Sequence, residues 1–235
     1  EATLRLVRPP RDVAVALVAF PDFDQVLTLL EQTRAADLHA FECFDAESST
    51  RVQAHLQISA PFQKTFPWYA LLEFETPAAD LLDQLSALEH CQLIETAGKR
   101  KEIWRHREAI SESIHTEVGS KQDVSLPPRL LARFVEQARV RAQEAQLTLC
   151  IFGHVADGNL HVNVLGERHR SAQLAEELLK LVRDLGGSIS AEHGIGLEKK
   201  SWLPYSRSGA EIEIMRQVKR VFDPDRVLNP GKIFD

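Results

Sequence analysis

Two short segments of the sequence contain residue types that bind metal ions and transfer protons. Residues 150–164 read CIFGHVADGNLHVNV, and residues 190–196 read SAEHGIG. If Asp157–Gly158 forms a two-residue hairpin turn, which this dipeptide favours, His154 lies directly opposite His161. Opposed residues share one face of a sheet with Cβ atoms about 5 Å apart, and two imidazoles at that spacing can bind one cation. An ordinary polar hairpin would show the same pair.

The second segment adds a carboxylate and another imidazole. Glu192 would complete a site of two histidines and one glutamate, with a position left open for a substrate oxygen, as in catalytic zinc centres. Because neighbours in an extended chain point to opposite faces, we expect only one of Glu192 and His193 to reach the metal. The other, His193, would serve as a proton acceptor. Asn163 would share the face of His161 and contact a ligand there.

The composition excludes several other classes of protein. The chain has 235 residues, 44% of them hydrophobic, and a formal net charge of -6, which argues against a nucleic-acid surface. The charged stretch 99–107 is interrupted by glutamate and tryptophan and predicts a helix face. No apolar run reaches the ~18 residues of a membrane span. Three distant cysteines without a C-x-x-C motif predict a reduced intracellular protein and no thiolate metal site.

The elements that would position these residues alternate between strands and helices. In the first half, apolar runs and periodicity predict strands at 13–20, 38–45, 68–75 and 91–97, and helices at 22–36 and 76–90. The second of these helices would be capped by Thr76 and opened by Pro77. This split β-α-β order predicts an α+β fold with a ferredoxin-like antiparallel sheet and helices packed on one face.

The second half repeats this organisation. We expect strands on either side of the turn at 156–159 and a short strand at 188–190. Helices are predicted at 99–117, 126–146, 171–186 and 208–222. The stretch 47–64 is expected to lack regular structure.

Three motifs together resemble the C-terminal domain of FAD-linked oxidases: GHVADGNLHVNV, SAEHGIGLEKK and the closing FDPDRVLNPGKIF. This family includes D-lactate dehydrogenases, the glycolate oxidase flavin subunit and D-2-hydroxyglutarate dehydrogenase, and the resemblance covers essentially the whole chain. It implies that residues 1–12 end a preceding FAD-binding domain and that 13–222 form the substrate- and metal-binding domain. Residues 223–235 would return toward the FAD domain, with Asn229 as a cofactor contact.

The resemblance also implies a reaction, the flavin-dependent oxidation of a D-2-hydroxy acid to the 2-oxo acid. Zinc or another divalent metal would be held by His154, His161 and Glu192. His193 matches the catalytic base of the family, and Asn163 matches a substrate contact. FAD would be bound mainly by the preceding domain, so we expect this chain to be inactive alone. No glycine-rich phosphate cradle occurs among its 11 glycines.

The resemblance assigns three further residues to the substrate. Arg107 matches an arginine that clamps a carboxylate, Ser111 stands where hydroxyglutarate enzymes have threonine, and Lys121 matches a lysine that reaches a distal carboxylate. K-x-D-V-S-L-P is closer to the hydroxyglutarate enzymes than to the D-lactate or glycolate branch. Two residues depart from the family pattern: Ala156 replaces a usual glycine, and Gln122 replaces a usual aromatic residue.

The expected partners are the 2-hydroxy acid, the FAD-binding domain and an electron acceptor, which would be an electron-transfer flavoprotein, a quinone or a partner subunit. The enzyme would be cytoplasmic in a bacterium and mitochondrial in a eukaryote. Two other classes remain open. A metal-dependent hydrolase would use the same ligands to activate water, and a non-catalytic module would bind a carboxylate without turnover.

Overall fold

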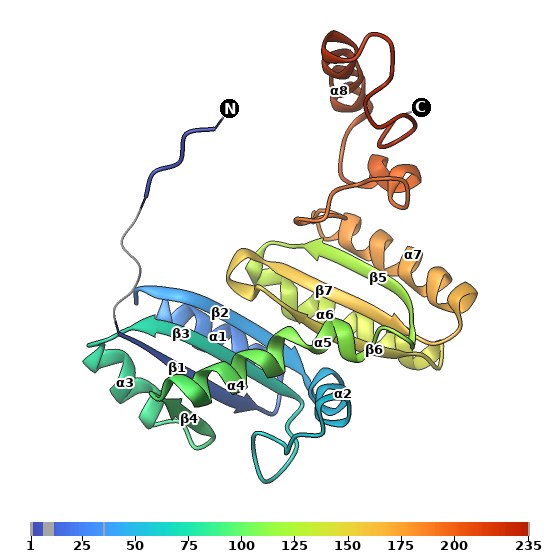
Figure 1. The fold of residues 1–235 in the computed structure, drawn as a ribbon. Coiled ribbons are helices and arrows are strands. Elements are labelled where there is room, and N and C mark those ends of the chain that lie inside the picture. Colours follow the sequence, from blue (N-terminus) through green and yellow to red (C-terminus); the bar gives the residue numbers. More distant parts are fainter. Residues whose placement is uncertain (1, 7–11, 35, 235) are drawn as a thin grey trace. The chain divides into compact units, whose positions relative to one another are not determined.

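The computed structural model describes residues 2–6, 12–34 and 36–234, which divide between two units, Glu1–Ser111 and Glu112–Asp235 (Figure 1). Each unit combines antiparallel strands with helices, as the predicted α+β class requires. Across these described ranges, every helix is too short or too polar to cross a membrane. The expected segment 1–12 falls partly on residues 1 and 7–11, outside the described residues, and the boundaries 1–12, 13–222 and 223–235 stay predictions.

The described residues of the first unit form four strands joined largely by helices. Its elements are β1 (Val13–Phe20), α1 (Phe23–Thr33), β2 (Leu38–Asp45), α2 (Ala46–Leu56), β3 (Trp68–Glu75), α3 (Ala79–Ser86), β4 (Cys91–Ile94) and α4 (Ala97–Glu108). The antiparallel order β4-β1-β3-β2 places the last strand beside the first, the split arrangement predicted from the sequence.

Helices contact both faces of this first sheet, whereas helices on one face only were predicted from the sequence. Phe23 of α1 packs against Trp68 of β3, with ring centroids 4.5 Å apart. Five residues along the same strand, Glu73 accepts a hydrogen bond of 2.7 Å from the indole of Trp104 in α4. Residues an odd number of positions apart point to opposite faces of a strand, so α4 covers the face that α1 does not. Because helices cover both faces of the sheet, β1 is a continuous apolar run that is buried along almost its whole length.

Three further predictions for this unit are wrong. The stretch 47–64 includes helix α2, whose start Asp45 caps by accepting the backbone N–H of Ser48 at 2.9 Å. The helix predicted from Thr76 begins at Ala79 without a side-chain cap. The single helix predicted over 99–117 is divided into α4 and the short α5 (Ile110–Ser113).

The second unit repeats the split arrangement in reduced form. It contains β5 (Val118–Ser125), α6 (Pro128–Glu144), β6 (Thr148–Gly153), a 3₁₀ turn at Val155–Asp157, β7 (Asn159–Leu165), α7 (Arg168–Asp184), a 3₁₀ helix at Lys200–Tyr205 and α8 (Gly209–Phe222). Strand β7 lies between β5 and β6 and is antiparallel to both. Helices α6 and α7 lie on one face of these strands (Figure 1).

The loop that follows α7 lies along the edge strand β5. The short strand predicted at 188–190 is an isolated bridge, in which Ser125 and Ser188 exchange backbone hydrogen bonds of 3.0 and 2.8 Å. Strand β5 was not predicted as a strand. Together, β5 and this bridge hold residues 190–199 next to the face of β7 that the helices leave uncovered.

Candidate active site

The hairpin that carries His154 and His161 differs from the predicted two-residue turn. Phe152 is the residue opposite His161, and one turn of 3₁₀ helix follows at Val155–Asp157. His154 therefore lies beyond the end of β6. The Asp157–Gly158 dipeptide does occur at the turn, but the 3₁₀ residues lengthen the loop. The predicted pairing of the two histidines is wrong.

Gly158 closes this loop for a steric reason. Its φ of 72° is left-handed, and an added Cβ would clash with the carbonyl oxygen of Leu126. Leu126 in turn donates its backbone N–H to the carbonyl oxygen of Gly158 at 2.9 Å. The loop is thereby tied to the residue that follows β5, which fixes its path beside the candidate site.

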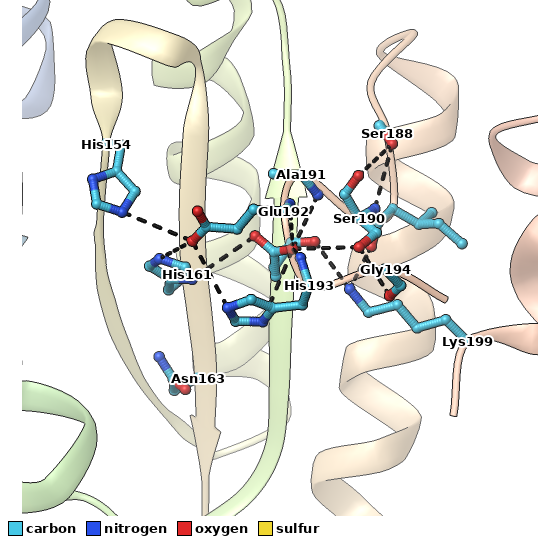
Figure 2. A network of polar contacts seen from close by, with 12 residues as sticks. His154, His161, Asn163, Ser188, Ser190, Ala191, Glu192, His193, Gly194 and Lys199 are labelled. Carbon is cyan, nitrogen blue, oxygen red and sulfur yellow. Dashed lines mark hydrogen bonds and ion pairs between the residues drawn. The ribbon is translucent and has the colours of Figure 1, made fainter. Parts of the chain in front are cut away.

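The two imidazoles nevertheless come together around Glu192. The ring centroids of His154 and His161 are 5.6 Å apart. Glu192 Oε1 lies 3.4 Å from His161 Nε2 and 3.8 Å from His154 Nε2 (Figure 2). Two ligands of a tetrahedral zinc ion at about 2.0 Å are roughly 3.3 Å apart. The distances from Glu192 Oε1 to the two imidazole nitrogens, 3.4 and 3.8 Å, are close to that spacing.

His193 faces the same carboxylate, contrary to the expectation from an extended chain. Its Nε2 lies 3.8 Å from Glu192 Oε1, and its ring stacks on His161 with centroids 5.3 Å apart. Residues 191–193 form a bend, so adjacent side chains reach one cluster. His193 is 63% exposed and His161 only 12%, which places His193 on the open side.

Asp123 anchors this bend, and its role was not predicted from the sequence. Its Oδ2 accepts the backbone N–H groups of Ala191, Glu192 and His193 at 3.0, 2.9 and 2.9 Å. Burial raises the pKa of Asp123, but these hydrogen bonds and the nearby His193 and Lys199 lower it overall. The available signal was the aspartate in K-x-D-V-S-L-P, two residues from Lys121 on the same face of a strand.

Asp123 also belongs to a second grouping of candidate ligands. Ligand atoms of Asp123, His161, Glu192 and His193 lie within 4.8 Å of one another. This group contains His193 in place of the predicted ligand His154. The mutual distances thus favour His193 over His154 as a neighbour of His161 and Glu192, although His154 Nε2 also lies 3.8 Å from Glu192 Oε1.

The register of β5 with β7 extends the site along the sheet. Asp123 pairs with His161, and Lys121 pairs with Asn163. Residues two apart on a strand share a face, so Lys121 and Asn163 lie in line with the histidine cluster. Lys121 is exposed, whereas Asn163 is buried and donates to the carbonyl oxygen of Cys150 at 3.3 Å.

The remaining predicted site residues lie elsewhere in the chain. Arg107 is buried in the first unit and donates from Nε and Nη2 to Glu42 Oε2 at 3.0 and 2.8 Å. Ser111 is exposed in α5. Asn229 is exposed in the C-terminal segment with a φ of 45°. Their roles in binding a substrate or cofactor stay predictions.

The chain is similar to several curated dehydrogenases. D-2-hydroxyglutarate dehydrogenase from Stutzerimonas stutzeri is 36% identical over 255 aligned residues, which cover 100% of this chain and 55% of the relative. The mitochondrial D-2-hydroxyglutarate dehydrogenase of Bos taurus is 34% identical, covering 95% and 44%. The D-lactate dehydrogenase of Archaeoglobus fulgidus is 30% identical, covering 99% and 54%. The chain spans about half the length of these relatives.

Solved structures and a family model agree on the fold. The 4-ethylphenol oxidase of Gulosibacter chungangensis superposes with a TM-score of 0.69 at 13% identity, covering 98% of this chain and 55% of that one. A p-cresol methylhydroxylase gives 0.66 at 12% identity, covering 96% and 53%. The family described as FAD linked oxidases, C-terminal domain, matches residues 9–233. The chain belongs to this family.

Proposed function

We propose that this chain is the substrate- and metal-binding domain of an FAD-dependent dehydrogenase that oxidises D-2-hydroxyglutarate to its 2-oxo acid. The observation that carries the proposal is the convergence of three imidazoles on Glu192, in line with Lys121 and Asn163. The identity of 36% to a D-2-hydroxyglutarate dehydrogenase supports the choice of substrate. D-lactate is the alternative, because a D-lactate dehydrogenase is 30% identical over nearly the whole chain.

We assign the metal ligands to His154, His161 and Glu192. Their two imidazole nitrogens and one carboxylate oxygen suit zinc or a neighbouring divalent ion, and three protein ligands leave a position for substrate. When bound, the metal would act as a Lewis acid on the hydroxyl and carboxylate oxygens of the substrate.

His193 is the group that we assign to accept the proton of the substrate hydroxyl. Its imidazole is 63% exposed, and its backbone is fixed by the 2.9 Å hydrogen bond to Asp123. A positioned base must lie within hydrogen-bond reach of the proton that it removes. A substrate whose hydroxyl lies beside Glu192 would bring that proton to His193. The FAD that the family implies would supply the two-electron acceptor for this oxidation.

Lys121 and Asn163 would contact the remainder of the substrate. An exposed ammonium in line with the cluster suits the distal carboxylate of a dicarboxylic acid, which D-lactate lacks. Gln122, which replaces the aromatic residue usual in the family, does not change the sheet face that carries Lys121, because neighbouring strand residues point to opposite sides. Gln122 is buried, and its Nε2 donates to Ser120 Oγ at 3.0 Å.

The proposed substrate can be tested in the full-length parent protein. Under anaerobic conditions, D-2-hydroxyglutarate should bleach the bound flavin, and the L enantiomer should not. Lys121→Ala should lower kcat/KM for D-2-hydroxyglutarate about 10- to 100-fold, because a hydrogen bond to a charged group contributes ~1.5–3 kcal/mol. The same variant should change kcat/KM for D-lactate by less than about threefold.

Lys180→Ala is the matched control, since Lys180 is an exposed lysine that pairs with Glu176 at 2.8 Å on helix α7. It should affect neither substrate. Equal losses on both substrates would assign the chain to the monocarboxylate branch. Hydrolysis without flavin reduction, or tight binding of the hydroxy acid without turnover, would contradict the dehydrogenase itself.

A further inference from the structure

We propose that Asp123 is a buried positioning residue that sets the geometry of the metal site. One carboxylate oxygen holds the backbone that carries Glu192 and His193. The other would accept a hydrogen bond from Nδ1–H of His161 and thereby fix the tautomer of that ring. The inference deepens the proposed function and rests on the metal site assigned there.

The first half of this role follows from the contacts of Oδ2. Three consecutive backbone N–H groups, from Ala191 to His193, converge on this single oxygen. Successive N–H groups pointing at one anion form a nest, which holds a loop tightly because each bond is charge-assisted. Ser190 Oγ adds a weaker contact to the same oxygen at 3.3 Å. Two of the three anchored residues carry the carboxylate and the base of the site.

Lys199 strengthens the same connection between β5 and the loop. Its buried ammonium donates to the carbonyl oxygen of Asp123 at 3.0 Å and to that of Ile189 at 2.6 Å. Burial lowers the pKa of Lys199, and the nearby Asp123 charge opposes that shift. The side chain and the backbone of Asp123 are thus both held by residues 189–199.

The second half of the role concerns Oδ1. This atom is buried and has no hydrogen-bond partner among the described residues. A buried acceptor without a hydrogen bond destabilises the fold by about 1–3 kcal/mol, so we expect this oxygen to have a partner in the functional state. His161 Nδ1 lies 3.9 Å away, and the two residues are directly paired across β5 and β7. Under the proposal, the imidazole turns toward Oδ1 until Nδ1–H comes within hydrogen-bond range.

The opposite ring nitrogen shows why this contact matters. His161 Nε2 faces Glu192 Oε1 at 3.4 Å. A carboxylate that accepts Nδ1–H leaves the lone pair of Nε2 available for a metal and raises its basicity. Asp123 is 2% exposed and faces the nitrogen that points away from Glu192, which favours positioning over direct coordination.

Asp123→Asn in the full-length protein separates this role from simple structural support. Three N–H donors require an oxygen in the nest, so the amide nitrogen must face His161. An NH₂ group there favours the Nε2–H tautomer, which cannot bind a metal. Zn²⁺ affinity, measured by competition with a chelator, should fall about 10- to 100-fold. The visible spectrum of the Co²⁺-loaded protein should change as well, while circular dichroism should match the wild type.

Ser190→Ala is the matched control, because it removes a hydroxyl that contacts Asp123 Oδ2 at 3.3 Å and the carbonyl oxygen of Gly194 at 3.0 Å but leaves every backbone N–H of the nest in place. Its Zn²⁺ affinity should stay within about threefold of wild type. Equal affinities for Asp123→Asn and Ser190→Ala would overturn the inference while leaving the proposed metal site intact. A wild-type protein that binds no divalent ion would instead overturn the metal site, and the inference with it.

A second measurement is made on the wild-type protein itself and uses a variant only to assign the signal. Nitrogen NMR of the metal-free wild-type protein, labelled with ¹⁵N-histidine, reports which ring nitrogen of His161 carries the proton. The signal is assigned by its loss in His161→Gln. The Nδ1–H tautomer is the expected result, and a predominant Nε2–H tautomer would overturn the role of Asp123.

Discussion

Replacing His161 with alanine should abolish metal binding and substrate oxidation together. Its Nε2 is the imidazole nitrogen nearest Glu192, at 3.4 Å, and its side chain is only 12% exposed. Removing it would leave two of the assigned ligands, which hold zinc poorly because affinity depends on ligand number and preorganisation. We expect less than about 0.1 metal ion per protein and a loss of at least ~10³-fold in flavin reduction, since Lewis-acid assistance contributes several kcal/mol.

Metal analysis and stopped-flow flavin reduction of the full-length protein would check this result. His169→Ala is the matched control, because His169 is an exposed histidine on α7 whose Nε2 lies 3.3 Å from Gln173. It should retain full metal content and full activity. A His161→Ala variant with wild-type metal content would contradict the assigned ligand set.

His193→Ala should separate chemistry from metal binding. Metal content should stay near that of the wild type, because Glu192 keeps its side chain and residue 193 keeps its backbone N–H to Asp123. Flavin reduction should slow by about 10²- to 10⁴-fold, the usual effect of losing a positioned general base. Metal analysis and single-turnover kinetics on the same preparation would measure both quantities, and substrate should still bind.

The comparison with His154→Ala decides between the two ligand sets. If His154 is the ligand, His154→Ala loses the metal and His193→Ala does not. The reverse pattern would support the grouping of Asp123, His161, Glu192 and His193. A His193→Ala variant could instead lose the metal and recover a normal rate of flavin reduction once metal is resupplied. That result would show that His193 is not the catalytic base.

Local sequence patterns predicted the strands and helices whose buried residues are apolar. Strand β1 matches its predicted bounds, Val13–Phe20, because helices on both faces require an unbroken apolar run. Helix α2 was missed because its buried residues are Ser48, Ser49 and Val52, which give no apolar stripe. Its only clear sequence signal was the cap at Asp45, which was read as the end of a strand.

The site was predicted in part and for a partly wrong reason. His154 and His161 do come together, but the 3₁₀ turn and the loop at 190–193 bring them there, not direct pairing across a hairpin. The anchoring role of Asp123 could not be predicted from its own motif, because the backbone groups that it binds lie 68 to 70 residues further along the chain. Strand β5 was not predicted for a similar reason. Its own sequence is largely polar, and the strand forms through its pairing with β7.

The most direct test of the account is single-turnover flavin reduction by D-2-hydroxyglutarate before and after metal removal. The full-length protein would be stripped with a chelator, assayed anaerobically, and assayed again after one equivalent of Zn²⁺ is returned. We predict that stripping slows flavin reduction by at least ~10³-fold, that one equivalent of metal restores it, and that L-2-hydroxyglutarate reduces the flavin in neither state. Flavin reduction at the full rate in verified metal-free protein would contradict the account.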